Sequence, residues 1–147
     1  MAIKDRARKV MWKGTVGGHV RVYRWTNGKI GGSMRGASIL LLTTTGRRSG
    51  QRRTTPLLFL RKGDAYVVVA SNGGLDTHPS WYVNLLANPE AEIRIGSERV
   101  RVRARVAPPE ERAELWTRIV ERNAGYETYQ RKTSREIPVV VLERAGT

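Results

Sequence analysis

The residues best suited to chemistry lie in one segment, residues 43–53, with the sequence Thr-Thr-Thr-Gly-Arg-Arg-Ser-Gly-Gln-Arg-Arg. Gly46 and Gly50 allow backbone conformations in which consecutive N–H groups turn toward one point. Guanidinium groups flank those N–H groups and match phosphate oxygens in a bidentate way that lysine does not. They belong to Arg47, Arg48, Arg52 and Arg53. The pattern predicts a phosphate-binding loop, and the alternative is a solvated basic hairpin tip that binds no ligand.

Other forms of chemistry lack the side chains that they need. The chain has no cysteine, which excludes a disulfide framework and a thiolate metal site. Its two histidines, His19 and His78, are too far apart in sequence to suggest a metal motif. No Ser-His-Asp or paired-carboxylate constellation is visible. We therefore expect no bound metal and no catalysis by a thiol.

The excess positive charge is confined to the first part of the chain. The net charge is +14; residues 1–62 contain fifteen Lys or Arg and one acid, Asp5, whereas residues 63–147 contain twelve basic and twelve acidic residues. Such a block attracts nucleic acid, an anionic membrane surface or a polyanionic small molecule, because long-range electrostatic attraction does not distinguish among them. With 147 residues, the chain fits a single domain overall.

Residues 1–35 are predicted to form a basic helical segment, since Val16, Val20 and Tyr23 recur at helical spacing after a run of Lys and Arg. This helix either packs against the domain formed by residues 36–147 or lies on an anionic membrane surface. The longest apolar run, residues 65–70, is far shorter than the ~20 residues that span a bilayer, and the N-terminus has no signal-peptide core. We expect a cytoplasmic location, with peripheral membrane association as an open alternative.

Apolar runs on both sides of the arginine-rich segment, residues 39–42 and 56–60, predict two strands that hold a polar loop between them. Gly63 and Asp64 mark a turn before an uninterrupted β-branched run, so residues 56–70 predict a hairpin. A short helix is expected to begin at Pro79 and must end before Pro89.

The strict alternation of residues 98–106 predicts a strand with arginines on a solvated face and small apolar residues on the other. Glu90, Glu92 and Glu98 are placed to pair with these arginines across strands. Residues 108–111 begin a helix with an apolar stripe, and residues 138–142 supply a last strand. The order of elements predicts a mainly β, antiparallel fold with peripheral helices.

Three motifs, in this order, carry a resemblance to a known family. They are Leu-Thr-Thr-Thr-Gly-Arg-Arg-Ser-Gly-Gln at residues 42–51 followed by Pro56-Leu57, Ala-Ser-Asn-Gly-Gly at residues 70–74, and Pro-Ser-Trp-Tyr-Val-Asn-Leu at residues 79–85 followed by Ala-Asn-Pro. Together they resemble the deazaflavin-dependent nitroreductase family. With the tyrosines near residue 126 and the strand at residues 137–141, the resemblance covers residues 15–143.

The resemblance implies a split β-barrel, related to the flavin-binding barrels of pyridoxamine-phosphate oxidases, that holds coenzyme F420 instead of flavin mononucleotide. The residues expected on the phosphate side are Arg47, Arg48, Ser49, Gly50, Gln51 and Arg53. The residues expected along the deazaflavin ring are Pro56, Leu57, Ala70, Ser71, Asn72, Trp81 and Asn84. A polyanionic coenzyme accounts for the charge of residues 1–62 better than nucleic acid does, so no nucleic-acid partner is expected.

The same resemblance implies candidate catalytic residues near the hydride acceptor. Tyr126 and Tyr129 occupy two positions at which tyrosines of a late helix close over the ring and contact the acceptor. Asn123 occupies a third position that is aromatic in the family, which alters the expected pocket wall. The hydroxyl of Ser71 is a candidate to polarise the acceptor's oxygen; alternatively, this serine merely ends a strand.

These expectations describe an F420-dependent oxidoreductase that passes a hydride to a planar, electron-poor small molecule: a quinone, an activated enone or, adventitiously, a nitro-aromatic. The protein supplies orientation and water exclusion, because the hydride donor belongs to the coenzyme. The alternatives are an F420 carrier without efficient turnover, a barrel that binds nucleic acid and a barrel that uses flavin mononucleotide. We make no prediction of the oligomeric state.

Overall fold

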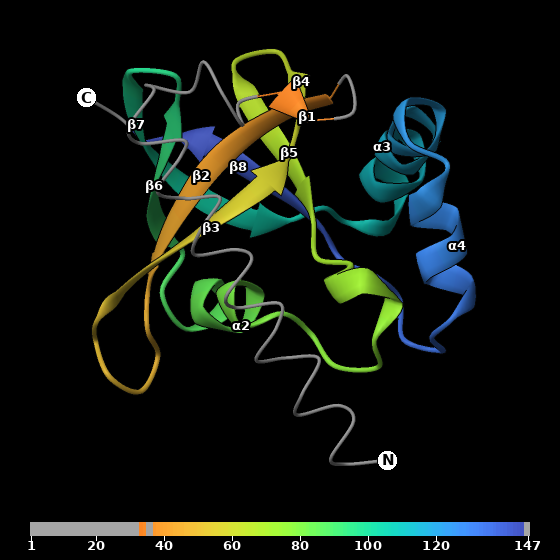
Figure 1. Ribbon diagram of the computed structural model, residues 1–147, viewed down its shortest axis with the longest axis horizontal. Helices are drawn as coiled ribbons and strands as arrows, with labels where there is room; N and C mark the ends of the chain where they lie inside the picture. The colour runs from red at the N-terminus through yellow and green to blue at the C-terminus, as the bar shows by residue number, and fades with distance from the viewer. Residues whose placement is uncertain (1–32, 35–36, 146–147) are drawn as a thin grey trace.

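The computed structural model of the chain describes residues 33–34 and 37–145 (Figure 1). Its strands are β1 (Ser33–Met34), β2 (Ala37–Thr45), β3 (Arg52–Leu58), β4 (Leu60–Lys62), β5 (Ala65–Val69), β6 (Glu90–Ile95), β7 (Glu98–Val106) and β8 (Val139–Arg144). Its helices are α2 (Ser80–Ala87), α3 (Pro109–Arg122), α4 (Gly125–Arg131) and the short 3₁₀ helix η1 (Asn72–Gly74). No helix in this described part is long and apolar enough to cross a membrane.

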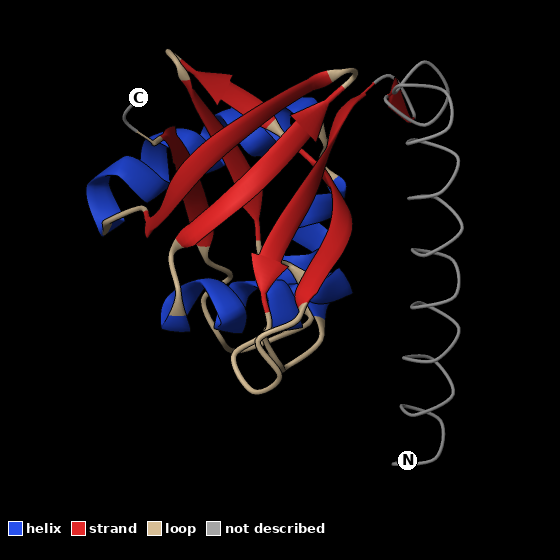
Figure 2. Ribbon diagram, turned by 90° about the vertical axis from the view of Figure 1, so that its left-hand side faces the viewer, coloured by secondary structure: helices blue, strands red, loops and turns tan. Residues whose placement is uncertain are grey.

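The strands form an antiparallel barrel. Their order is β1-β2-β6-β7-β8-β5-β4, and β3 pairs with β2 from Ile39 opposite Leu58 to Thr45 opposite Arg52. Only Phe59 separates β3 from β4, so one nearly continuous stretch pairs first with β2 and then, through β4, with β5. This bent stretch closes the sheet on itself (Figure 2).

Alternate residues of the strands fill the barrel, as the period of two along a strand requires. The strands contribute Leu40, Leu42, Tyr66, Val68, Ala70, Ala91, Ile93, Val100, Val102, Val140 and Leu142. Helix α2 adds Trp81, Tyr82 and Leu85 to the same core. It therefore closes one end of the barrel, the lower end in Figure 1.

The opposite faces of β5 and β8 bury a second core beneath α3 and α4. This core contains Leu60, Val67, Val69, Ala107, Leu115, Ile119, Ile137, Val139 and Val141. Strands β5 and β8 are therefore apolar on both faces, which explains their uninterrupted runs of valine. Both helices lie outside the barrel on this side (Figure 1).

The expected class, mainly β and antiparallel with peripheral helices, is confirmed. The hairpins, the short helix that ends before Pro89 and the closing strand also form where the sequence predicted them. The solvated arginine face of β7 exists, and Arg103 lies 3.7 Å from Glu90 in an ion pair. The other two predicted glutamates pair outside this strand, Glu92 with Arg52 and Glu98 with Arg144.

Two local expectations are wrong. Val106, expected on the apolar face of β7, is 44% exposed, and its neighbour Ala107 enters the second core instead. The late helical region is two helices rather than one, because the extended backbone of Asn123 ends α3 and its side-chain oxygen accepts the N–H of Gly125 at 3.0 Å as α4 begins.

The basic helix predicted for residues 1–35 lies outside the described residues, apart from Ser33–Met34. That pair forms β1 and pairs with Ala37 and Ser38. The division of the chain at residues 35 and 36, the cytoplasmic location and contact with a membrane remain predictions.

Candidate active site

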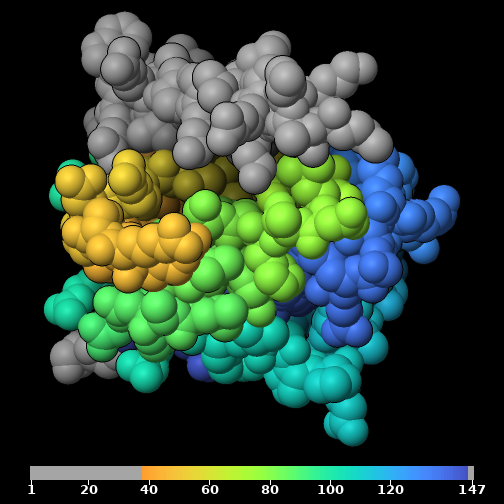
Figure 3. All heavy atoms as spheres, turned by 90° about the horizontal axis from the view of Figure 1, so that it is seen from below, coloured from red at the N-terminus to blue at the C-terminus, as the bar shows by residue number. Residues whose placement is uncertain are grey.

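Helix α2 is the central support of the candidate site. Figure 3 shows the loop after β2, α2, η1 and α4 side by side on one face of the molecule. The side chain of Asn84 reaches the loop after β2, and the ring of Tyr82 packs on His78, with ring centroids 4.8 Å apart. The barrel end thus brings together motifs that are some 40 to 80 residues apart in the sequence, from Arg47 to Tyr126.

The arginine loop (residues 46–51, between β2 and β3) is fastened to α2 by Asn84. The Oδ1 of Asn84 accepts the backbone N–H of Arg47 at 3.1 Å and its guanidinium at 2.9 Å. The Nδ2 of Asn84 donates to the hydroxyl of Thr44 at 3.4 Å. Because Asn84 is only 4% exposed and Thr44 is fully buried, this contact fixes the base of the loop.

Hydrogen bonds within the arginine loop set its backbone. Gly46 donates to the carbonyl of Gln51 at 2.7 Å, Gly50 to that of Gly46 at 2.9 Å, and Gln51 to the hydroxyl of Ser49 at 3.1 Å. Gly50 has a φ of 70°, which favours glycine. The N–H groups of Arg48 and Ser49 have no partner within residues 33–34 and 37–145, so two consecutive donors stay free at an exposed tip.

The four arginines in and next to the arginine loop differ in whether their side chains have a partner. Arg47 is engaged by Asn84, and Arg52 forms an exposed ion pair with Glu92 at 3.5 Å. The side chains of Arg48 and Arg53 have no hydrogen-bond or ion-pair partner in the described part of the chain, and both residues are exposed. In the described part of the chain, residues 46–53 thus contain two N–H groups and two guanidinium groups without a partner, and donors of these types bind phosphate.

A second motif, the Ser71 turn (residues 70–75), faces α4. Within it, Gly74 donates to the carbonyl of Ser71 at 2.9 Å, and Asn72 has a φ of 48°. A Cβ on Gly74 would lie 2.9 Å from the carbonyl oxygen of Tyr129 and 3.0 Å from its Cα, so only glycine permits this approach. The Ser71 hydroxyl, half-buried, has no partner among the residues that the structure describes.

Arg135 holds the Ser71 turn from the segment after α4. Its guanidinium donates to the carbonyls of Leu75 at 2.9 Å, Ser71 at 2.8 Å and Ala70 at 3.3 Å, and lies 3.1 Å from Nδ1 of His78. Burial, and then the positive charge of Arg135, lower the pKa of His78. Arg135 was not predicted from the sequence, because nothing about a single arginine in a polar stretch indicates that its guanidinium will contact distant backbone carbonyls.

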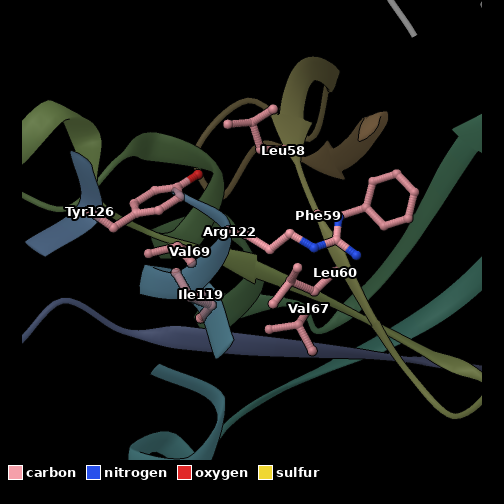
Figure 4. A pocket seen from close by; sticks show the side chains of 8 residues that line it. All are labelled: Leu58, Phe59, Leu60, Val67, Val69, Ile119, Arg122 and Tyr126. Atoms are coloured by element: carbon pink, nitrogen blue, oxygen red, sulfur yellow. The ribbon is translucent and has the colours of Figure 1, made fainter. Parts of the chain in front are cut away.

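Tyr126 and Tyr129 lie on α4 with their rings edge to face, 5.9 Å apart at 82°. Burial, with a smaller contribution from Tyr129, raises the pKa of Tyr126 to about 12. Its ring lines a small cavity of about 30 Å³ with Val69, Ile119 and Arg122 and with the end of β3 (Figure 4). Tyr126 is therefore a neutral hydroxyl at the edge of an apolar space whose lining includes Val69, the residue before the Ser71 turn.

The residues predicted along the ring occupy unequal places. Pro56 and Leu57 are partly buried on β3, whereas Ala70 and Trp81 are enclosed in the barrel core, with 0% and 7% exposure. The last two offer little surface to a ligand and support the site from beneath. The side chains of two further residues are engaged by the protein itself: the Nδ2 of Asn72 donates to the carbonyl of Thr77 at 2.9 Å, and Asn84 holds the arginine loop. Direct contact of these residues with the ring remains a prediction.

The family model described as F420H(2)-dependent quinone reductase matches residues 16–144. An F420H(2)-dependent quinone reductase of Mycobacterium tuberculosis (strain ATCC 25618 / H37Rv) is 50% identical over 130 residues, covering 86% of this chain and 87% of that protein.

Solved structures agree with this assignment. An F420-H2 dependent reductase, FDR-A, has 42% identity and a TM-score of 0.66 over 71% of this chain and 93% of its own. A FAD-binding protein from Mesorhizobium loti shares the fold at 11% identity, with a TM-score of 0.52 over 74% of this chain and 79% of its own. The expected split barrel is thereby confirmed, as are the expected enzyme class and coenzyme F420. This chain belongs to the F420H(2)-dependent quinone reductase family.

Proposed function

We propose that this protein reduces a quinone with hydride from reduced coenzyme F420, binding the coenzyme through the arginine loop and the acceptor beside Ser71, Tyr126 and Tyr129. The observation that supports it most is the exposed segment of residues 46–53, where two N–H groups and two guanidinium groups have no partner among the described residues. The match of residues 16–144 to the quinone reductase family supports F420, rather than nucleic acid, as this anion.

The arginine loop orients the coenzyme through its phosphate. Arg48, Ser49 and Arg53 donate to phosphate oxygens, while Arg47 stays with Asn84 and keeps the loop on α2. Gln51 and Gly50 shape the loop around these donors. A loop that is fastened before the ligand arrives spends little binding free energy on ordering, which favours tight binding.

Coenzyme F420, when reduced, supplies the hydride at its deazaflavin ring. The residues beside the acceptor donate hydrogen bonds rather than accept protons, because Tyr126 with a pKa of about 12 stays neutral near pH 7. The hydroxyls of Ser71 and Tyr126 stabilise the negative charge that develops on the quinone oxygen as the hydride arrives. The Tyr126 and Tyr129 rings exclude water from this region.

Quinones are proposed over the other predicted acceptors because a quinone has two carbonyl oxygens on separate ring carbons, which can accept hydrogen bonds from separate hydroxyls. An enone has one such oxygen, and the two oxygens of a nitro-aromatic share a single nitrogen. The free hydroxyl of Ser71 and the neutral phenol of Tyr126 offer two such donors from different elements, the turn after β5 and α4. The M. tuberculosis relative carries the name of a quinone reductase, in agreement with this choice.

The test begins with a fluorescence titration of the purified protein with oxidised F420, with flavin mononucleotide and a short DNA duplex in parallel at two salt concentrations. We expect F420 alone to bind. Oxidation of reduced F420 is then followed by absorbance with menadione, an enone and a nitro-aromatic, and menadione should have the highest kcat/KM. Binding without acceptor-dependent oxidation would identify a carrier, and DNA binding without a response to F420 would overturn the proposal.

A further inference from the structure

We infer that Arg135 is a positioning residue for hydride transfer: it fixes the Ser71 turn and thereby the direction of the Ser71 hydroxyl and the approach of α4. The inference rests on the proposed function only for the role of Ser71. It depends on the contacts between Arg135 and the turn, which are independent of any ligand.

A single half-buried guanidinium spans the whole turn. The Nε of Arg135 donates to the carbonyl of Leu75, and its Nη2 donates to the carbonyl of Ser71. Its Nη1 donates to the carbonyl of Ala70 and to the ring of His78. Both ends of residues 70–75 are therefore bonded to one rigid, planar group. The carbonyl of Ser71 also accepts the N–H of Gly74, so the turn's own hydrogen bond shares an oxygen with Arg135. Lysine cannot reproduce these contacts, because an ammonium group is a point and not a fork.

The position of the fork links three parts of the site. The Ser71 carbonyl and hydroxyl belong to one residue, so fixing the carbonyl limits the directions open to the hydroxyl. The Gly74 end of the turn is in contact with the backbone of Tyr129, so the same clamp sets how close α4 comes. His78, at the other side of the fork, packs on Tyr82 of α2 and extends the connection to the barrel end.

Other arginines of the chain do not share this role. Arg112 donates to the carbonyl of Ile137 and stacks on Trp116, and Arg144 donates to the Tyr66 hydroxyl at the opposite end of β8. In the described part of the chain, neither arginine forms a hydrogen bond with the Ser71 turn. Arg144 therefore provides a control, a more exposed arginine that donates to a side chain of its own and lies away from the site.

The experiment compares Arg135→Lys, Ser71→Ala, the double variant and Arg144→Lys. In the protein without ligand, hydrogen exchange is measured at the amides of Gly74 and Leu75, which are bonded within the turn. We expect Arg135→Lys to speed exchange there by about tenfold and leave β2 and β6 unchanged, because a local contact governs local opening. Arg144→Lys should leave the turn's exchange as in the wild type.

Kinetics test the action through Ser71. With menadione as acceptor, Arg135→Lys and Ser71→Ala should each lower kcat by about tenfold with little change in the dissociation constant of F420, and the double variant should be no slower than Ser71→Ala alone within about twofold. Multiplying losses, or unchanged exchange at Gly74 and Leu75, would overturn the inference. A wild-type protein that binds F420 but reduces no quinone would instead refute the proposed function, and the exchange result would still decide whether Arg135 holds the turn.

Discussion

The arginine loop and the Ser71 turn lie on the same face of the molecule (Figure 3), but they are held in place by different chemistry. A neutral, buried amide, Asn84, holds the loop and leaves its charged groups free at the surface. A charged guanidinium, Arg135, holds the turn and leaves a neutral hydroxyl free beside α4. Neutral Asn84 thus holds charged groups, and charged Arg135 holds a neutral hydroxyl. In neither case does the residue that holds the segment use up the hydrogen-bond donors that a ligand would meet.

This difference has a functional reason. A carboxylate in place of Asn84 would neutralise the arginines that attract an anion, and the loop would lose its purpose. Arg135 does not neutralise any charged group at the turn, because its guanidinium donates to backbone carbonyls and the Ser71 and Tyr126 hydroxyls are uncharged. Under the proposed function, the loop provides affinity and the turn provides geometry.

Two of the three positive-φ glycines in these regions, Gly74 and Gly50, give the largest expected contrast. Gly74→Ala introduces strain at a φ of 82° and a clash with the Tyr129 carbonyl at 2.9 Å, so it should lower the free energy of unfolding by about 3 kcal/mol. Gly50→Ala, at a φ of 70° with no atom within 4 Å, should cost about 1 kcal/mol. Urea denaturation measures both, and equal losses would mean that α4 yields to the added methyl group.

Replacing Asn84 should damage the arginine loop and the fold together. Asn84→Ala leaves Thr44 and the Arg47 N–H without their partner, which should destabilise the protein by about 2 kcal/mol and weaken F420 binding by about tenfold. Thermal denaturation and the F420 titration check these two effects. As a control, Asn88→Ala removes an exposed side chain whose one hydrogen-bond partner among the described residues is the Glu90 N–H, and it should leave affinity unchanged.

Arg48→Ala should separate affinity from stability. The Arg48 side chain is exposed and has no partner in the described residues, so its removal should leave the melting temperature unchanged. The dissociation constant of F420 should rise by about tenfold, because a charged hydrogen bond to phosphate is lost, while hydride transfer from bound coenzyme slows less. Arg99→Ala, an exposed arginine of β7, is the matched control. Unchanged F420 affinity in Arg48→Ala would refute the phosphate assignment.

Tyr126→Phe should show the reverse pattern at the other region. The ring still fills the space beside Val69, so F420 binding should remain near the wild-type value, whereas kcat should fall by about tenfold through loss of one hydrogen bond. Because the pKa of Tyr126 is raised to about 12, kcat of the wild type should stay constant with respect to this group up to about pH 11. Weakened F420 binding with normal kcat would assign Tyr126 to the coenzyme site.

The smallest effect is expected away from both regions. Hydrogen bonds from Arg105 and then Lys62 lower the pKa of Glu111 to about 2, against burial, which opposes this shift. A carboxyl pKa that is lower in the folded state adds stability above pH 4.5, and this stability is lost as the pH falls from about 4.5 to about 2. Glu111→Gln should therefore reduce the slope of the free energy of unfolding against pH in this range, by an amount that corresponds to the binding of at most one proton. The F420 affinity and kcat should be unchanged. A change in kcat would show that α3 is coupled to the site.

Much of the fold was accessible from local pattern. Alternation along β7, glycine turns between hairpins and the two prolines around α2 each act over a few residues, so they can be interpreted without knowing the rest of the chain. Val106 and the break at Asn123 were not predicted correctly, because the end of a strand and the start of α4 depend on which neighbour covers them. The closure of the barrel at Phe59 also depends on pairing with two distant strands.

The candidate site divides in the same way. The arginine loop was recognisable because its donors are consecutive, and residue type with spacing defines the chemistry of a short loop. Arg135 and the support role of Asn84 were not, since their partners lie 37 to 65 residues away. The sequence by itself determined which groups are candidates to bind phosphate and to polarise a carbonyl, and these roles remain predictions. Only the tertiary structure decided which residues hold them in place. Every residue has a backbone carbonyl, so the sequence does not indicate which carbonyls an arginine such as Arg135 will contact.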